Sequence, residues 1–322
     1  MHFEPNVRTA DPKTSAQAST QLNTPKLGEG VLVSYGSLAL LVLAALIHAT
    51  WNLMAKRAAS AGLSFVFAYN LISLVAYAPW VIWVLAHGHF PWSLKVACCL
   101  FVSGLIHLAS SLSFQRGYQV ADFSVVYPVA RGTGPMLSTI CAFLALGETP
   151  TGLGLFGLLA VVAGIASITT QGDLSGFKKP AGLNGVWWGS AVGASIAAYT
   201  IVDTFGVKTL GIAPVVLIWF AAVMRFALLA PFVARNPASN FELMQGKWWL
   251  AIGVGLLSML PYILVLIAIE MEAPVSVVTP ARELSMIFAA LLGKVILGER
   301  VGLWRLIGCA ALIAGVVSLS MS

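Results

Sequence analysis

The chain has 322 residues, of which 59% are hydrophobic and only 9% are charged. A soluble domain carries about a quarter charged residues, so this composition excludes an ordinary soluble globular protein. The net charge of +6 comes from lysines and arginines scattered over short connections, and the absence of a basic stripe with interleaved aromatic residues excludes a nucleic-acid-binding surface.

The first 33 residues are polar and rich in Thr, Ser, Asn, Gln and Pro. Such a segment buries too little apolar surface to order itself, so it predicts a disordered tail over residues 1–33. Ten apolar segments follow, each about twenty residues long and therefore able to cross a hydrocarbon core of about 30 Å. They lie at 34–56, 64–86, 94–115, 121–146, 152–170, 184–207, 213–234, 248–269, 273–297 and 301–320. This pattern predicts an all-α integral membrane protein with ten transmembrane helices.

The sequence contains no recognisable catalytic or metal-binding motif. The four cysteines fall in apolar segments, with a spacing that fits neither a disulfide framework nor a zinc site. No P-loop, H-E-x-x-H or G-x-S-x-G motif occurs. We therefore expect no metal, no cofactor and no enzymatic activity, and the lack of a nucleotide-binding motif argues against a self-powered pump.

The second half of the chain repeats the first at a separation of 152 residues. The phrase SVVYP at 124–128 matches SVVTP at 276–280. After a one-residue gap, Arg131 matches Arg282, and LGE at 146–148 matches LGE at 297–299. A single register with one gap over most of each half predicts an internal duplication.

The duplication divides the spans into five and five. We expect the first repeat at residues 34–170, a linker at 171–183 and the second repeat at 184–322. A unit with an odd number of spans ends on the opposite side of the membrane from where it began, so the second repeat is predicted to be inverted. Inverted repeats are typical of secondary transporters, whose substrate sites lie between the repeats near the bilayer midplane.

The repeated phrases also resemble a known family. The proline–arginine phrases, the LGE sequences, the Gly-rich last helix of each half and the segment LIHATWNLMAKRA at 46–58 resemble the drug/metabolite transporter superfamily, specifically its EamA-type members. The resemblance covers essentially everything after the tail. It implies two inverted five-helix halves around a central cavity, and an exporter of metabolites or drugs in a bacterial-type inner membrane.

Two signals in the sequence disagree about the orientation of the chain in the membrane. The resemblance implies that both termini are cytoplasmic, and we adopt that expectation. Lysine and arginine residues, however, are more frequent at the span ends on the side away from the termini. The positive-inside rule taken alone therefore places the termini outside.

Arg131 and Arg282 are the first candidate site residues. Each follows a proline by two or three residues within an apolar segment. A charge at the bilayer centre costs at least ~2.5 kcal/mol and faces the bundle interior or water. We interpret the two arginines as a clamp for an anionic or zwitterionic solute, aided by the positive N-terminus of a helix. The alternative is that both side chains extend to the lipid headgroups.

Glu283 directly follows Arg282 in the same apolar surroundings. A carboxyl group removed from water binds a proton more readily, which suits a proton carrier. Adjacent residues of a helix point about 100° apart, so the two neighbours are not an obvious pair. The alternative is a structural ion pair with an arginine of another helix, such as Arg225 or Arg116.

Aromatic and amide side chains inside the spans complete the predicted substrate site, which also includes Trp51, Asn52, Tyr127 and Tyr199. They suit a partly apolar solute, and the alternative for each is helix packing. Asn52 is favoured because a buried amide needs more partners than packing supplies. Three further intramembrane residues are left outside the predicted site: we interpret His48 and His107 as packing residues, and Asp203 faces either the cavity or the interface.

The sequence thus predicts a secondary transporter that moves a small polar, anionic or zwitterionic metabolite or drug by alternating access, with Glu283 as the candidate for proton coupling. The expected partners are the solute and membrane lipids, with no nucleic acid, and both a monomer and a homodimer are compatible with the pattern. Two alternatives remain: a flippase for lipids or lipid-linked sugars, and a membrane partner subunit that transports nothing.

Overall fold

The computed structural model describes residues 34–88, 90–121, 123–145, 147–149, 151–178, 182–297 and 302–322. The predicted tail, residues 1–33, lies outside these ranges. Within them every regular element is a helix, and the helices belong to one compact unit. The all-α prediction is confirmed for this part of the chain.

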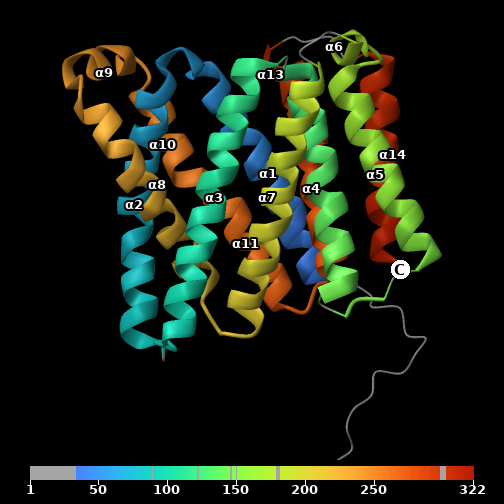
Figure 1. Cartoon of the computed structure of the whole chain (residues 1–322), viewed down its shortest axis with the longest axis horizontal. Coiled ribbons are helices and arrows are strands. Elements are labelled where there is room, and N and C mark those ends of the chain that lie inside the picture. Colours follow the sequence, from blue (N-terminus) through green and yellow to red (C-terminus); the bar gives the residue numbers. More distant parts are fainter. Residues whose placement is uncertain are drawn as a thin grey trace, which may run out of the picture. The chain divides into compact units, whose positions relative to one another are not determined.

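The first half contains five long helices and one short 3₁₀ turn (Figure 1). They are α1 (Tyr35–Arg57), η1 (Ala59–Ala61), α2 (Gly62–His87), α3 (Leu94–Val120), α4 (Phe123–Ala145) and α5 (Gly152–Thr170). Their bounds lie close to the predicted spans because each apolar run ends in a polar connection. α3 continues past the predicted end at 115, since the Gln and Arg residues that follow also favour a helix.

The second half contains more and shorter elements. They are α6 (Ser175–Lys178), α7 (Gly182–Lys208), α8 (Pro214–Ala234), α9 (Pro237–Met244), α10 (Trp248–Leu257), α11 (Leu260–Glu270), α12 (Val275–Ala281), η2 (Arg282–Leu284), α13 (Ser285–Leu297) and α14 (Leu303–Ser320). α6 lies in the predicted linker and α9 in a predicted connection.

Two predicted spans of the second half, 248–269 and 273–297, are broken helices. Pro261 lies in the first turn of α11 and has no backbone N–H, so the hydrogen-bond ladder of α10 does not continue through it. Pro280 lies at the end of α12, and the chain tightens there into η2 before α13 begins. The corresponding helices of the first half, α3 and α4, are continuous.

Across the described ranges, nine helical segments are long and apolar enough to cross a membrane. Two of them are the broken pairs, Trp248–Glu270 and Val275–Ile296. The remaining predicted span, 121–146, corresponds to α4, which has sufficient length but is not among the nine. Arg131, two prolines and several small polar residues lower its apolar content.

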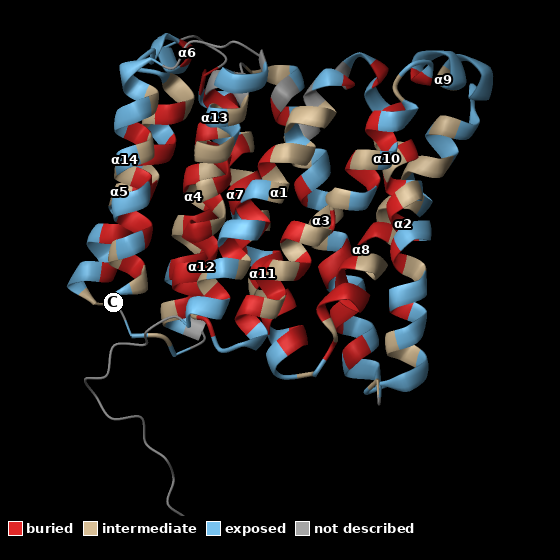
Figure 2. Cartoon of the chain, turned by 180° about the vertical axis from the view of Figure 1, so that it is seen from behind, coloured by how far each residue is buried: buried red, intermediate tan, exposed pale blue. Residues whose placement is uncertain are grey.

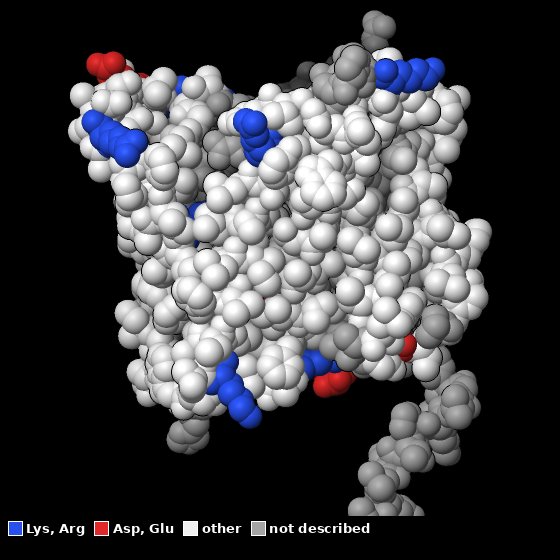
Figure 3. Space-filling view, viewed as in Figure 1, with Lys and Arg blue, Asp and Glu red and all other residues white. Residues whose placement is uncertain are grey.

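The outer surface of the bundle is apolar. Many leucine, valine, phenylalanine and tryptophan side chains are exposed on it, and the buried residues lie on the inward faces of the helices (Figure 2). In the space-filling view, most Lys, Arg, Asp and Glu side chains lie near two opposite edges, with a nearly uncharged band between them (Figure 3). This distribution is typical of a multi-pass membrane protein, whose middle band faces lipid.

The two halves pack against each other reciprocally. α1 packs on α11 and α13, while α3 and α4 pack on α7. α2 packs on α8 and α10, and α3 packs on α8. In repeat terms, the first helix of each half contacts the third and fourth helices of the other. The core of the bundle is therefore the boundary between the halves.

The last helices of the halves, α5 and α14, form a close antiparallel pair at one end of the bundle (Figure 1). A Cβ atom added at Gly157 would lie 2.7 Å from the carbonyl oxygen of Gly315, and one at Gly164 would lie 2.8 Å from that of Gly308. Only glycine permits this backbone approach. Small residues are a common means of close helix packing in membranes.

Candidate functional site

The charged centre of the bundle is an ion pair between the two halves. Arg131 of α4 donates from Nη1 to Oε1 of Glu283 in η2 at 3.0 Å, and the side chains are only 16% and 6% exposed. The alternative interpretation of Glu283, an ion pair with an arginine of another helix, is thus found in the structure, but the partner is Arg131 and not Arg225 or Arg116. A buried pair of this kind needs close geometry and further hydrogen bonds to offset desolvation.

Arg131 makes two further contacts. Its Nε donates to the hydroxyl oxygen of Tyr127, one turn earlier on α4, at 3.2 Å. Its Nη2 lies 3.3 Å from Nε2 of His48 on α1. A guanidinium group can only donate, so Nε2 of His48 is the acceptor and carries no hydrogen in this arrangement. The His48 ring also lies edge-on to Trp51, with 5.1 Å between ring centroids.

Arg282 lies beside the ring of Tyr262, with Cζ 4.7 Å from the ring centroid. This distance is within the range of a cation–π interaction. In the described part of the chain, two buried polar atoms of this region lack a hydrogen-bond partner. One is the donor Nη1 of Arg282, and the other is the acceptor Oε2 of Glu283.

A small cavity of about 80 Å³ lies between these groups. It is lined by Ala44, Ala45, His48, Arg131, Ser258, Pro261, Tyr262, Val265 and Arg282. At about 30 Å³ of liquid volume per molecule, this space holds only a few waters. Ser258 and Pro261 belong to the break between α10 and α11, so irregular backbone borders the cavity, as at many transporter sites.

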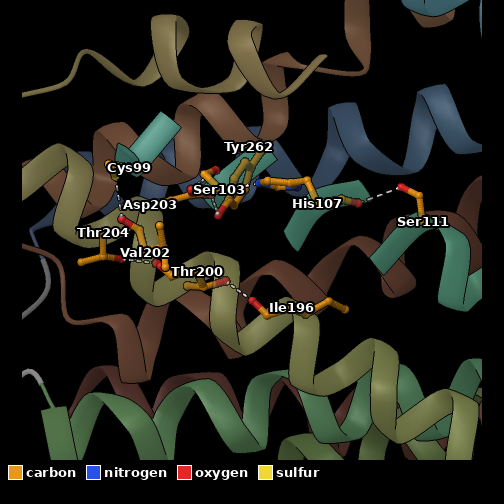
Figure 4. A network of polar contacts seen from close by, with 10 residues as sticks. All are labelled: Cys99, Ser103, His107, Ser111, Ile196, Thr200, Val202, Asp203, Thr204 and Tyr262. Carbon is orange, nitrogen blue, oxygen red and sulfur yellow. Dashed lines mark hydrogen bonds and ion pairs between the residues drawn. The ribbon is translucent and has the colours of Figure 1, made fainter. Parts of the chain in front are cut away.

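A second polar cluster lies beside this cavity, around Asp203 of α7 (Figure 4). Asp203 is fully buried. Its Oδ1 accepts from the Ser103 hydroxyl at 2.5 Å, and its Oδ2 accepts from the Tyr262 hydroxyl at 2.8 Å. Nε2 of His107 lies 3.1 Å from the same Oδ2. The open choice for Asp203 is thus decided: its carboxylate faces the bundle interior.

Two regions of the chain, residues 36–170 and 183–321, match the model of the EamA-like transporter family. The chain belongs to this family. The resemblance noted in the sequence is thereby confirmed, and a multi-pass membrane protein is the expected member of such a family. A search of the curated proteins gave no match.

A solved crystal structure shares the fold of this EamA-like chain. The TM-score is 0.64 at 16% sequence identity, and the match covers 88% of this chain and 95% of the other. At this identity the similarity concerns the fold alone.

The structure brings together several residues of the predicted site in this EamA-like protein. Tyr127, Arg131, Arg282 and Glu283 share the charged centre. Trp51 contacts it through His48, and its indole Nε1 is buried without a hydrogen-bond partner among the described residues.

Tyr199 lies beside Arg282 and also belongs to the neighbouring cluster, where its ring stacks on His107 with 4.0 Å between centroids. One predicted residue lies elsewhere. Asn52 is exposed, and its amide donates to the backbone oxygen of His48 at 2.7 Å. The expectation of a buried amide was wrong, because the preceding turn of the same helix supplies the partner.

Sequence reasoning left out the Asp203 cluster. One signal was available: Ser103 and His107 are four residues apart on α3 and therefore share a face. A carboxyl group in a predicted span needs such donors. The sequence does not show which helix packs against this face of α3.

Proposed function

We propose that this EamA-like protein is a secondary transporter for a small carboxylate-bearing solute, anionic or zwitterionic, that binds in the cavity between its halves. The observation that carries the proposal is that two buried polar atoms, Nη1 of Arg282 and Oε2 of Glu283, have no hydrogen-bond partner among the residues that the structure describes. Leaving such an atom unsatisfied costs about 1–3 kcal/mol, and more for charged groups. A solute carboxylate would satisfy Arg282, and an ammonium group would satisfy Glu283.

The charge of the site favours the same class of solute. Arg131 and Arg282 line the cavity, and Glu283 balances one of the two positive charges. Among the described residues Arg282 makes no ion pair of its own, so its guanidinium can bind a solute carboxylate, and charge-assisted hydrogen bonds to arginine are the stronger kind. Tyr127 and Trp51 lie behind the lining residues Arg131 and His48, where an enlarged cavity would expose their rings to a solute with an apolar portion.

Movement of the helices is required for transport, because the cavity of about 80 Å³ is too small for most metabolites. The reciprocal packing of the halves supports an inverted repeat, and α4, which packs beside α5 and α7, supplies the tenth span. Alternating access would then rock one half against the other, with the broken helices α10–α11 and α12–α13 adjusting at the site.

We further propose an inner-membrane location with both termini cytoplasmic. Export and Glu283 as the proton carrier stay predictions from the sequence. The polar lining favours a transporter over the partner-subunit alternative, for which we expected a cavity filled by apolar side chains. The enclosed ion pair favours it over a lipid flippase.

A thermal-shift screen tests the proposal. The purified protein would be melted with amino acids, organic acids, sugar phosphates, nucleotides and amphipathic drugs, as wild type and as Arg282→Gln. Lys208→Gln is the matched control, because it removes a cation whose pair with Glu272 is exposed. A solute at 100 times its Kd adds about 2.7 kcal/mol of stability.

We expect a carboxylate-bearing solute to stabilise wild type and Lys208→Gln but not Arg282→Gln. The same solute should enter proteoliposomes that contain wild type. If it stabilises Arg282→Gln equally, or if no carboxylate binds, the proposed substrate site is wrong.

A further inference from the structure

The Asp203 cluster contains a histidine–carboxylate pair that the proposed substrate site does not use. The pair joins two helices, α3 and α7, and Tyr262 adds α11 (Figure 4). Ser103 donates to Oδ1 and Tyr262 to Oδ2 of Asp203, so both carboxyl oxygens act as acceptors. Nε2 of His107 is then a donor to Oδ2, which leaves Nδ1 as the position where a further proton binds.

The two intramembrane histidines differ in this respect. Nε2 of His48 accepts from Arg131, so its ring nitrogen faces a cation. Nε2 of His107 lies 3.1 Å from a carboxylate oxygen instead. Histidine is the side chain whose charge changes most readily between about pH 5 and 8. His107 is therefore the better placed of the two to take up a proton.

Tyr262 connects this pair to the substrate cavity. Its hydroxyl donates to Asp203, its ring lies 4.7 Å from Cζ of Arg282, and it lines the cavity. Tyr199 supports both neighbours, since its ring stacks on His107 and meets the Tyr262 ring edge-on at 5.6 Å. Tyr199 also lies beside Arg282, so these two tyrosines separate the His107–Asp203 pair from the Arg282 guanidinium, and Tyr262 is the one bonded to the carboxylate.

We propose that the His107–Asp203 pair is a proton-binding site, coupled through Tyr262 to the arginine that binds the solute carboxylate. The coupling rests on the proposed function. Asp203 and Glu283 balance Arg131 and Arg282 while His107 is neutral. A proton from water, bound at Nδ1, adds one positive charge, and a solute anion at Arg282 neutralises it. Proton and anion then bind together, and the proton returns to water when the anion leaves.

Other titratable and charged groups lie on the elements packed against α3 and α7. They are Cys99 on α3, Tyr199 on α7, Tyr262 on α11, Arg131 on α4 and Arg225 on α8. Arg282 and His48 line the cavity beyond Tyr262. Asp203 is the carboxylate in direct contact with His107. Glu283 is in contact with Arg131 instead, so a proton would have to compete with that arginine. This difference is why we assign the coupling proton to His107–Asp203 ahead of Glu283.

The test follows the protonation of histidine by ¹⁵N NMR of the purified full chain labelled at histidine. His107→Gln, which keeps an N–H donor toward Asp203, assigns the His107 signal. In wild type that signal should titrate between pH 5 and 8. Asp203→Asn should lower its midpoint by about one pH unit or more, as the loss of an adjacent opposite charge does. Glu283→Gln should lower it less.

The coupling is measured with sodium acetate as the probe, compared with sodium chloride at the same ionic strength. Acetate should raise the His107 midpoint in wild type, and the rise should be lost in Arg282→Gln and in Tyr262→Phe, which keeps the ring but not the hydroxyl. Linkage is reciprocal, so the factor by which acetate tightens proton binding at His107 should equal the factor by which that proton tightens acetate binding.

Three results would overturn the proposal: a His107 signal that does not titrate, a midpoint indifferent to Asp203→Asn, or an acetate response that survives in Arg282→Gln. A larger effect of Glu283→Gln than of Asp203→Asn would assign the proton to Glu283. If acetate has no effect on the midpoint while carboxylates still stabilise wild type in the thermal screen, the proposed function stands and the coupling fails. If no carboxylate binds in either assay, the substrate site itself is wrong.

Discussion

Arg131→Gln should be among the most destabilising single changes in the chain. Arg131 is the cation that neutralises buried Glu283, whose side chain is 6% exposed. Removing one partner of a buried pair costs about 3–5 kcal/mol, because the remaining charge stays buried without compensation. Removing both partners is often close to neutral, so Arg131→Gln/Glu283→Gln should recover most of the loss.

The chain provides a matched control for this cost. Lys208 and Glu272 form a pair with the same 3.0 Å separation, but their side chains are 31% and 85% exposed. Exposed pairs contribute about 0–1 kcal/mol, so Lys208→Gln should change stability little. Because the charged atoms are 3.0 Å apart in both pairs, the difference between the costs of Arg131→Gln and Lys208→Gln measures the effect of burial.

Reversible unfolding in mixed micelles, followed by tryptophan fluorescence, would measure the free energy of unfolding of four proteins. They are wild type, Arg131→Gln, the double variant Arg131→Gln/Glu283→Gln and Lys208→Gln. A cost within about 1 kcal/mol of that of Lys208→Gln would refute the reasoning. A double variant no more stable than Arg131→Gln would refute it as well.

Three further predictions concern helix packing, capping and the aromatic wall. Gly164→Ala would place a Cβ 2.8 Å from a backbone oxygen of α14 and should cost about 1–3 kcal/mol in the same unfolding assay, whereas Gly152→Ala in the same helix meets open space and should not. Glu148 accepts from the first two N–H groups of α12 at 2.7 and 3.1 Å, so Glu148→Gln should lower stability by about 1–2 kcal/mol; an unchanged melting temperature would contradict this role. Trp51→Phe removes an unpartnered N–H and should leave the melting temperature unchanged while weakening carboxylate binding; equal affinity would show that the indole contacts no solute.

The sequence predicted the helices well because span length depends on a local property, the length of an apolar run. It did not predict the two breaks in the second half. Pro261 and Pro280 stand inside continuous apolar runs, and a proline there permits either a kink or an interruption. The neighbouring helices decide between them, since they determine whether the freed backbone groups find partners.

The ion pair was harder to predict, for a reason that lies in the repeat. Alignment of the halves matches Arg131 with Arg282, yet in space Arg131 meets Glu283, which is 152 positions away. The repeat shows which residues occupy similar places in each half but not which residues meet across the boundary. The Asp203 cluster was missed partly for the same reason, because Ser103 and His107 come from α3 in the other half.

The packing of one half on the other has a consequence for how the protein is made. Arg131 enters the membrane before its partner exists, since Glu283 is synthesised 152 residues later. At about 5–20 residues per second, that interval lasts roughly 8–30 s. During it, the glycine face of α5 has no α14 to cover it, and Glu148 has no helix to cap. The first half is therefore an open intermediate during biogenesis, and it depends on lipid, water or a chaperone until the ribosome has completed the second half.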